Sequence, residues 1–80
     1  MVEVNLWSGM RRFVGDELVV EVEAKTIGEM LDALVAAHPA LEPIIAQGVS
    51  VAVDGEIHVG RHIPIPPGVE VYLMNRLKGG

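Results

Sequence analysis

The spacing of hydrophobic residues changes from period two to a helical period and back again, and this change constrains the fold more than any other feature. Alternation of hydrophobic with other residues is typical of strands that have one buried face. From Ile27 to His38, hydrophobic residues instead recur at the three- and four-residue intervals of an amphipathic helix. The resulting order, β-β-α-β-β-β, predicts an α+β domain of two layers. The expected strands are residues 2–7, 18–23, 49–53, 57–59 and 69–74.

The two ends of the expected helix are marked in the sequence. Thr26 is expected to cap the first turn, with Glu29 reaching back in a capping box. Pro39 is expected to end the helix near His38, because the residue before a proline is pushed out of helical geometry. Hydrophobic residues within 41–45 then predict a short further turn of helix against the core.

Glycine, proline and aspartate mark the connections between the expected elements. Asp54-Gly55 suits a two-residue hairpin turn of type I′, which needs positive φ at both positions. Residues 8–15 are expected to form a loop bounded by glycines, and residues 60–68 a loop rich in proline. A single helix covers one core only if the first and last strands are neighbours. The sequence therefore predicts that these two strands lie side by side.

Composition argues against several classes of protein. A chain of 80 residues is one small domain, and without cysteine it has no disulfide, thiolate metal site or cysteine nucleophile. Eleven acidic and six basic residues give a net charge of −5, whereas a nucleic-acid binder usually has a basic face. No hydrophobic run reaches membrane-spanning length, and the first residues do not resemble a signal peptide. We therefore expect a cytoplasmic protein that binds neither nucleic acid nor a membrane.

Three segments together resemble one known family. Residues 28–41 (the helix with the following Pro-Ala-Leu), residues 51–56 (Val-Ala-Val-Asp-Gly-Glu) and residues 68–74 leading to Gly79-Gly80 are similar to parts of the MoaD/ThiS sulfur carrier proteins, which are relatives of ubiquitin. The resemblance covers nearly the whole chain, and the distance from the last strand to the terminal glycines is its most specific part. Residues 75–78 instead resemble the ending of ubiquitin.

The resemblance implies a ubiquitin-like β-grasp domain over residues 1–74, with a mixed sheet of four to five strands on one main helix, and a flexible tail over residues 75–80. It also implies that the protein is not an enzyme. A partner activating enzyme uses ATP to adenylate the carboxylate of Gly80, while the carrier itself binds no cofactor and no metal. Because Gly79 and Gly80 lack Cβ atoms, they can enter a narrow channel, and a six-residue tail reaches roughly 20 Å.

Three functions remain open. In the first, which the helix and strand segments favour, a thiocarboxylate at Gly80 donates sulfur for molybdopterin- or thiamine-type cofactor biosynthesis to an acceptor enzyme or a large synthase subunit. In the second, Gly80 is joined to lysines of other proteins as a ubiquitin-like modifier. Arg76, Leu77 and Lys78 favour this second function, and in either case we expect them to contact the partner. The third is a non-catalytic interaction module.

The expected strands also predict a partner surface. Trp7, Tyr72 and Met74 fall on outward-facing positions of the first and last strands. If those strands are neighbours, the three side chains form an apolar patch with Val19 on the face opposite the helix. Exposed aromatic and apolar patches usually mark binding sites. In the alternative, Trp7 folds over the loop at residues 11–13.

Overall fold

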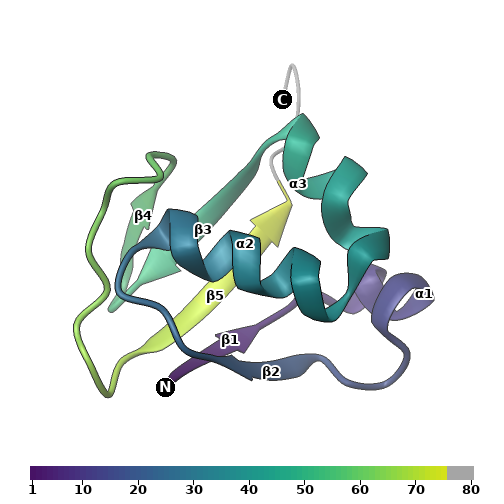
Figure 1. The fold of residues 1–80 in the computed structure, drawn as a ribbon, viewed down its shortest axis with the longest axis horizontal. Coiled ribbons are helices and arrows are strands. Elements are labelled where there is room, and N and C mark those ends of the chain that lie inside the picture. The colour runs from purple at the N-terminus through teal and green to yellow at the C-terminus, as the bar shows by residue number, and fades with distance from the viewer. Residues whose placement is uncertain (76–80) are drawn as a thin grey trace.

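The computed structural model describes residues 1–75 as a five-stranded mixed sheet with helices over one face (Figure 1). The strand order is β2-β1-β5-β3-β4. Two 3₁₀ turns, Ser8–Met10 and Pro39–Leu41, precede the first and third helices. The elements are β1 (Val2–Asn5), α1 (Arg11–Val14), β2 (Val19–Val22), α2 (Ile27–Ala37), α3 (Glu42–Gln47), β3 (Val49–Val53), β4 (Glu56–His58) and β5 (Glu70–Asn75).

The first and last strands lie side by side within the sheet, as predicted. β1 pairs in parallel with β5 and antiparallel with β2, while β5 pairs antiparallel with β3 on its other side. The parallel pairing places the carboxyl ends of β1 and β5 at the same end of the sheet. This is the arrangement of a ubiquitin-like β-grasp domain, so the predicted α+β fold is confirmed, with five strands.

The core lies between the sheet and the helices. Val4 of β1 and Val71 of β5 are direct partners in the sheet, and both are completely buried. Met30 and Leu34 on α2 are completely buried as well. Burying one such side chain stabilises a domain by about 1.5–3 kcal/mol. The inward positions of the expected strands and helix therefore supply this core.

The start of α2 confirms the predicted cap. The backbone N–H of Glu29 donates to Thr26 Oγ1 at 3.2 Å, and the N–H of Lys25 donates to Glu29 Oε1 at 2.8 Å. Glu29 thus reaches one residue further back than the expected capping box requires. The helix ends at its cap residue His38, directly before Pro39, as predicted.

The loop between β4 and β5 is fastened to the first turn of α2. The N–H groups of Ile27 and Gly28 donate to the carbonyl oxygens of Ile63 and Arg61, at 3.0 and 2.8 Å. N–H groups in a first helical turn have no partner within the helix, so the loop satisfies two of them. Ile65 of the same loop is buried in the core.

The turn between β3 and β4 has the predicted conformation. Asp54 has φ of 51° and Gly55 has φ of 86°, so both are positive, as type I′ requires. A two-residue turn fixes the register of the hairpin, and Ala52 accordingly lies opposite Ile57.

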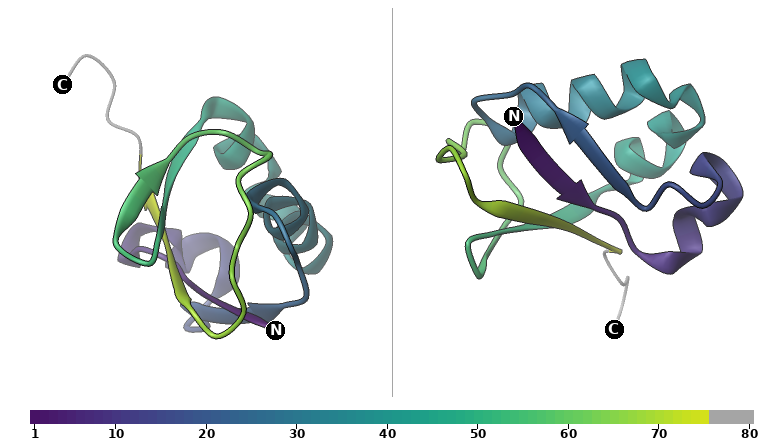
Figure 2. Two further views of the ribbon diagram at one scale, coloured as in Figure 1. Left: turned by 90° about the vertical axis from the view of Figure 1, so that its left-hand side faces the viewer. Right: turned by 90° about the horizontal axis from the view of Figure 1, so that it is seen from below.

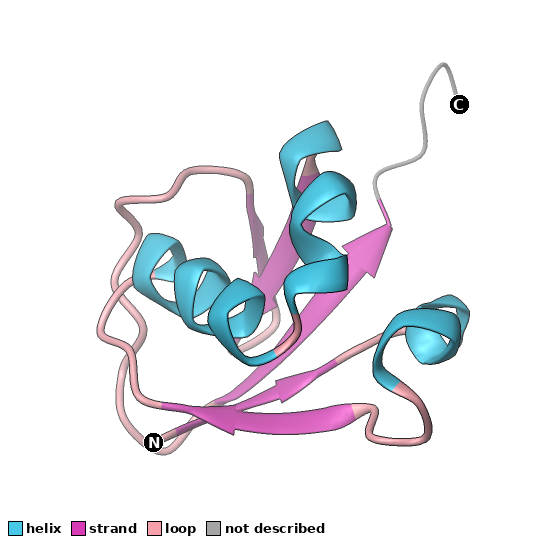
Figure 3. Cartoon of the chain, turned by 45° about the vertical axis from the view of Figure 1, so that its right-hand side comes forward, coloured by secondary structure: helices cyan, strands magenta, loops and turns pink. Residues whose placement is uncertain are grey.

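The segment predicted as a loop over residues 8–15 is partly helical, which corrects that prediction. It contains the 3₁₀ turn Ser8–Met10 and then α1 (Figure 3). The completely buried side chain of Met10 anchors the segment to the core. Periodicity cannot detect such a segment, because one buried residue in a few does not define a period.

The last strand extends further than predicted. β5 includes Asn75, which pairs with Val49 at the start of β3. The domain therefore continues one residue past the expected boundary at residue 74.

Candidate functional site

The carboxyl end of β5 is the point from which the chain continues toward its glycines. β1 and β5 run in the same direction there, so Trp7, which follows β1, belongs to the same end of the sheet. Residues 76–80 of the predicted flexible tail lie outside the described residues, and the roles predicted for them stay predictions. These residues are Arg76, Leu77, Lys78, Gly79 and Gly80.

The face of the sheet opposite the helices carries a row of side chains that crosses the five strands. The register places Val19, Asn5, Tyr72, Ala52 and Ile57 next to one another in strand order, and we call these five residues the outer row. Val19 is 49%, Tyr72 47% and Ile57 65% exposed. Exposed apolar side chains gathered on one face mark a surface that binds another protein.

The apolar surface continues beyond the outer row toward the carboxyl end of β5. Met74 lies opposite Ser50 and is half-buried, and Val59, directly after β4, is 64% exposed. Asn5 is the polar member of the outer row, but its side-chain amide donates to the carbonyl oxygen of Val71 at 3.2 Å. The helices lie on the other side of the sheet and leave this face open (Figure 2).

Trp7 lies beside this face rather than within the outer row. Its side chain is half-buried and packs against the core. The indole Nε1 is so near Gly9 that a Cβ atom there would lie 2.9 Å away, so the ring covers the 3₁₀ turn. This packing agrees with the alternative in which Trp7 folds onto its own loop, at Gly9 rather than at residues 11–13. A partner-binding role for Trp7 stays a prediction.

Sequence reasoning missed Ile57 and Ala52 as members of the outer row. The signal was nonetheless present in the two-residue turn at Asp54-Gly55. That turn puts Ile57 opposite Ala52, and directly opposed residues share a face of the sheet. Because Val51 and Val53 face the core, both residues must face outward.

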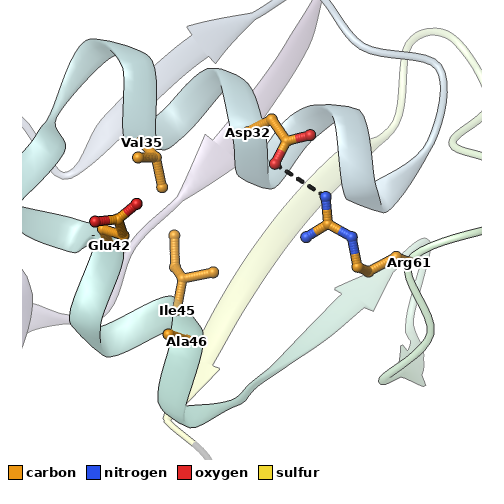
Figure 4. Close-up of a pocket in the computed structure, with 6 residues that line it drawn as sticks. All are labelled: Asp32, Val35, Glu42, Ile45, Ala46 and Arg61. Atoms are coloured by element: carbon orange, nitrogen blue, oxygen red, sulfur yellow. Dashed lines mark hydrogen bonds and ion pairs between the residues drawn. The ribbon is translucent and has the colours of Figure 1, made fainter.

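A hollow also lies on the helix side of the sheet, between α2, α3 and the loop that connects β4 to β5 (Figure 4). Arg61 Nη2 donates there to Asp32 Oδ1 at 2.9 Å and to the carbonyl oxygen of Gly28 at 3.3 Å. A Cβ atom at Gly28 would lie 3.1 Å from the Arg61 carbonyl oxygen, so helix and loop are in close contact. The guanidinium therefore fastens the loop to α2 beside this hollow, which α3 also lines. It is lined by Asp32, Val35, Glu42, Ile45, Ala46 and Arg61.

Two other kinds of site find no support within residues 1–75. No group of three His, Asp or Glu side chains there is placed to hold a metal ion. None of the described helices is both long and apolar enough to cross a membrane.

Comparison with protein families decides the family. The model of the ThiS family matches residues 4–80. The chain belongs to the ThiS family. The matched region includes Gly79-Gly80 and all but the first three residues, which confirms the resemblance found in the sequence. No curated protein sequence matches this ThiS-family chain.

Solved structures share the fold of this ThiS-family chain. A chain of the Amycolatopsis orientalis BexX/CysO complex is similar with a TM-score of 0.78 and 22% identity, and both chains are covered completely. SAMP1 from Haloferax volcanii has a TM-score of 0.74 and 30% identity, over 99% of this chain and 98% of that one. The H. volcanii small archaeal modifier protein 1 has a TM-score of 0.64 and 28% identity, over 95% and 97%. The ThiS-family chain thus falls among ubiquitin-like carrier and modifier proteins.

Proposed function

We propose that this chain is a sulfur carrier protein. A partner enzyme adenylates the carboxylate of Gly80 with ATP, and the product becomes a thiocarboxylate that donates sulfur in molybdopterin- or thiamine-type cofactor biosynthesis. The observation that carries the proposal is the ThiS-family match over residues 4–80, which includes Gly79-Gly80. The β-grasp domain supports it, because this fold offers an open sheet face for a partner, and the strand that leads to the terminal glycines, β5, lies in the middle of that sheet.

The chemistry requires activation, because a carboxylate is a poor electrophile. An oxygen of Gly80 attacks the α-phosphorus of ATP, and pyrophosphate leaves. A sulfur nucleophile at the oxidation level of sulfide then adds to the acyl carbon, and the bond from that carbon to the AMP oxygen breaks. The products are the thiocarboxylate, AMP and a proton. Both steps take place on partner enzymes, so the chain acts as a carrier and not as a catalyst.

The outer row is the proposed docking surface for these partners. Val19, Tyr72 and Ile57 expose apolar area on the same sheet whose β5 leads to the terminal glycines. Five residues after Asn75 can span at most roughly 17 Å. A partner that covers the outer face can therefore hold its reaction centre within reach of Gly80.

A second function, protein modification, is favoured by one specific observation. SAMP1 from Haloferax volcanii is 30% identical to this chain, and a second solved structure from that organism is described as small archaeal modifier protein 1. In that function the activated Gly80 forms an amide with a lysine of another protein. Both functions use the same activation step, so they differ only in the nucleophile that displaces the activating group.

Intact mass of the protein purified from its own host tests both functions. Exchange of one oxygen for sulfur at Gly80 supports the carrier, whereas Gly80 found as an amide on lysines supports the modifier. A plain carboxylate under all growth conditions contradicts both and favours an interaction module. A Gly80→Ala variant is the control: it is expected to fold normally and to lose both products, because its methyl group lies beside the reacting carbon. The measurement also establishes that Gly80 carries the free carboxyl group.

A further inference from the structure

Three glutamates form a second row next to the outer row, on the same face of the sheet. Glu3 on β1 lies directly opposite Glu21 on β2 and beside Glu70 on β5. We call these three residues the carboxylate row. Glu21 and Glu70 are exposed and Glu3 is half-buried. The Tyr72 hydroxyl donates to Glu70 Oε1 at 3.4 Å, so the two rows touch.

The carboxylate row has no cation to balance it in the described part of the chain. Directly opposed side chains on antiparallel strands have Cβ atoms about 5 Å apart, and like charges in that position destabilise the sheet. The net charge of −5 adds to the repulsion. The row therefore weakens the fold unless something else lies against it. The ion pairs among residues 1–75 are His38–Glu17, His58–Glu56 and Arg61–Asp32.

We propose that the carboxylate row is the charged half of the docking surface, and that the partner presents lysine or arginine side chains beside an apolar surface. The inference rests on the proposed function, because the partner in question is the adenylating enzyme. A partner that covered the outer row without cations would remove water from unpaired carboxylates, which is unfavourable. Nucleic acids and anionic membranes would be repelled by the same row.

The two rows make the outer face asymmetric along the direction of the strands. Glu3 and Glu70 lie near the starts of β1 and β5. The chain continues toward Gly80 from the carboxyl end of β5, at the opposite end of the sheet. A partner with cations on one side of its apolar surface therefore accepts the face in a single orientation. Charge complementarity of this kind fixes register and speeds association more than it adds affinity. In that orientation the carboxyl end of β5 lies at a fixed side of the partner.

The test compares two double variants of the full chain with the same change in net charge. Glu3→Gln/Glu21→Gln removes the central like-charge pair, and Asp16→Asn/Glu42→Gln is the matched control. Asp16 and Glu42 are exposed and form none of the ion pairs found in residues 1–75. The partner is the adenylating enzyme of the protein's own host, purified by its exchange of pyrophosphate into ATP that depends on the wild-type chain. KM and kcat for the chain are measured across a range of salt concentrations.

For Glu3→Gln/Glu21→Gln we expect KM at low salt to rise about three- to tenfold, with kcat unchanged, and the difference to shrink as salt screens the charges. The control is expected to keep the KM of the wild type. The same Glu3→Gln/Glu21→Gln protein should unfold at a temperature about 2–5 °C higher, because an uncompensated repulsion has been removed. A KM equal to that of the control, or an unchanged unfolding temperature, overturns the proposal.

A second variant reverses the charge at position 21. Glu21→Lys places a cation opposite Glu3, so it should stabilise the fold more than Glu21→Gln does and weaken docking more. Weaker docking by a more stable protein cannot arise from damage to the fold. If Glu21→Lys docks as well as the wild type, the partner has no cations at this row. If the wild type itself is never adenylated, the proposed function has failed, which is a different result.

Discussion

The two faces of the sheet differ in how their polar side chains are partnered. On the helix side, Arg61 is bonded to Asp32 and to Gly28, and the hydroxyl oxygen of Thr26 accepts the N–H of Glu29. On the outer face, the carboxylate row has no cation among the described residues, and the outer row leaves apolar area in water. The contacts on the helix side stabilise the fold, whereas the outer face is the proposed docking surface. Truncations on the helix side should therefore leave docking unchanged, and truncation of an apolar side chain of the outer row should leave the free energy of unfolding nearly unchanged.

The largest expected effect concerns the core under α2. Leu34→Ala should lower the free energy of unfolding by about 2–5 kcal/mol, because Leu34 is completely buried and its loss leaves a cavity. Urea denaturation followed by circular dichroism measures this change. Leu34→Met is the control and should lower the unfolding free energy by less than about 1.5 kcal/mol. An equal loss of unfolding free energy in both variants would show that stability does not depend on how well the side chain at this position fills the core.

The next effect is on binding at the outer face. Tyr72→Ala should raise KM for adenylation about 10- to 30-fold, because exposed aromatic residues at the centre of an apolar patch dominate docking. Its free energy of unfolding should change by less than about 1 kcal/mol, since the side chain is 47% exposed. Val35→Ala truncates an apolar side chain in the helix-side hollow and is the matched control, with KM unchanged. If Tyr72→Ala and Val35→Ala raise KM equally, docking is not confined to the outer face.

A smaller effect is expected at the cap of α2. Thr26→Ala removes the oxygen that accepts the Glu29 N–H and should lower the free energy of unfolding by about 1 kcal/mol. Thr26→Ser keeps the oxygen and should recover most of that loss. Thermal unfolding of the two variants measures the difference. KM should equal the wild-type value in both, and a raised KM in Thr26→Ala would extend the docking surface to the helix side.

The smallest effect concerns the Arg61–Asp32 ion pair. Its side chains are 58% and 74% exposed, so a double-mutant cycle with Arg61→Ala and Asp32→Ala should give a coupling of about 0.2–1 kcal/mol. The coupling should fall at high salt, because exposed pairs are screened. Urea titrations at two salt concentrations measure it. A coupling free energy that does not change with salt concentration would mean that packing, rather than charge, joins the loop to α2.

Local signals predicted the parts of the fold that depend on neighbouring residues. The cap at Thr26, the end of the helix at His38 and the turn at Asp54-Gly55 each follow from contacts within a few residues, and all three are confirmed. The pairing of the first and last strands was predicted as well, since one helix can cover the core in no other order. The family match confirms the resemblance that the terminal glycines helped to reveal.

Features that depend on distant residues were missed. The carboxylate row exists only because β1, β2 and β5 take one particular register, and no short turn fixes that register from the sequence. The turn containing Met10 depends on burial of that side chain in the core, which has no periodic signal. The outer row was half predicted, because Tyr72 and Val19 lie in segments of six residues with clear alternation in the sequence, whereas Ile57 lies on a strand of three residues.

The position of β5 has a consequence for how the protein is made. β5 leaves the ribosome after the other four described strands, yet it lies between β1 and β3 and brings Val71 and Leu73 into the core. A nascent chain that stops before residue 70 leaves β1 and β3 without a common neighbour, so its sheet stays open. Contacts between segments that are far apart in the sequence form late and slowly. The proposed docking surface therefore exists only in a chain that has been synthesised through β5 and has placed this strand in the middle of the sheet.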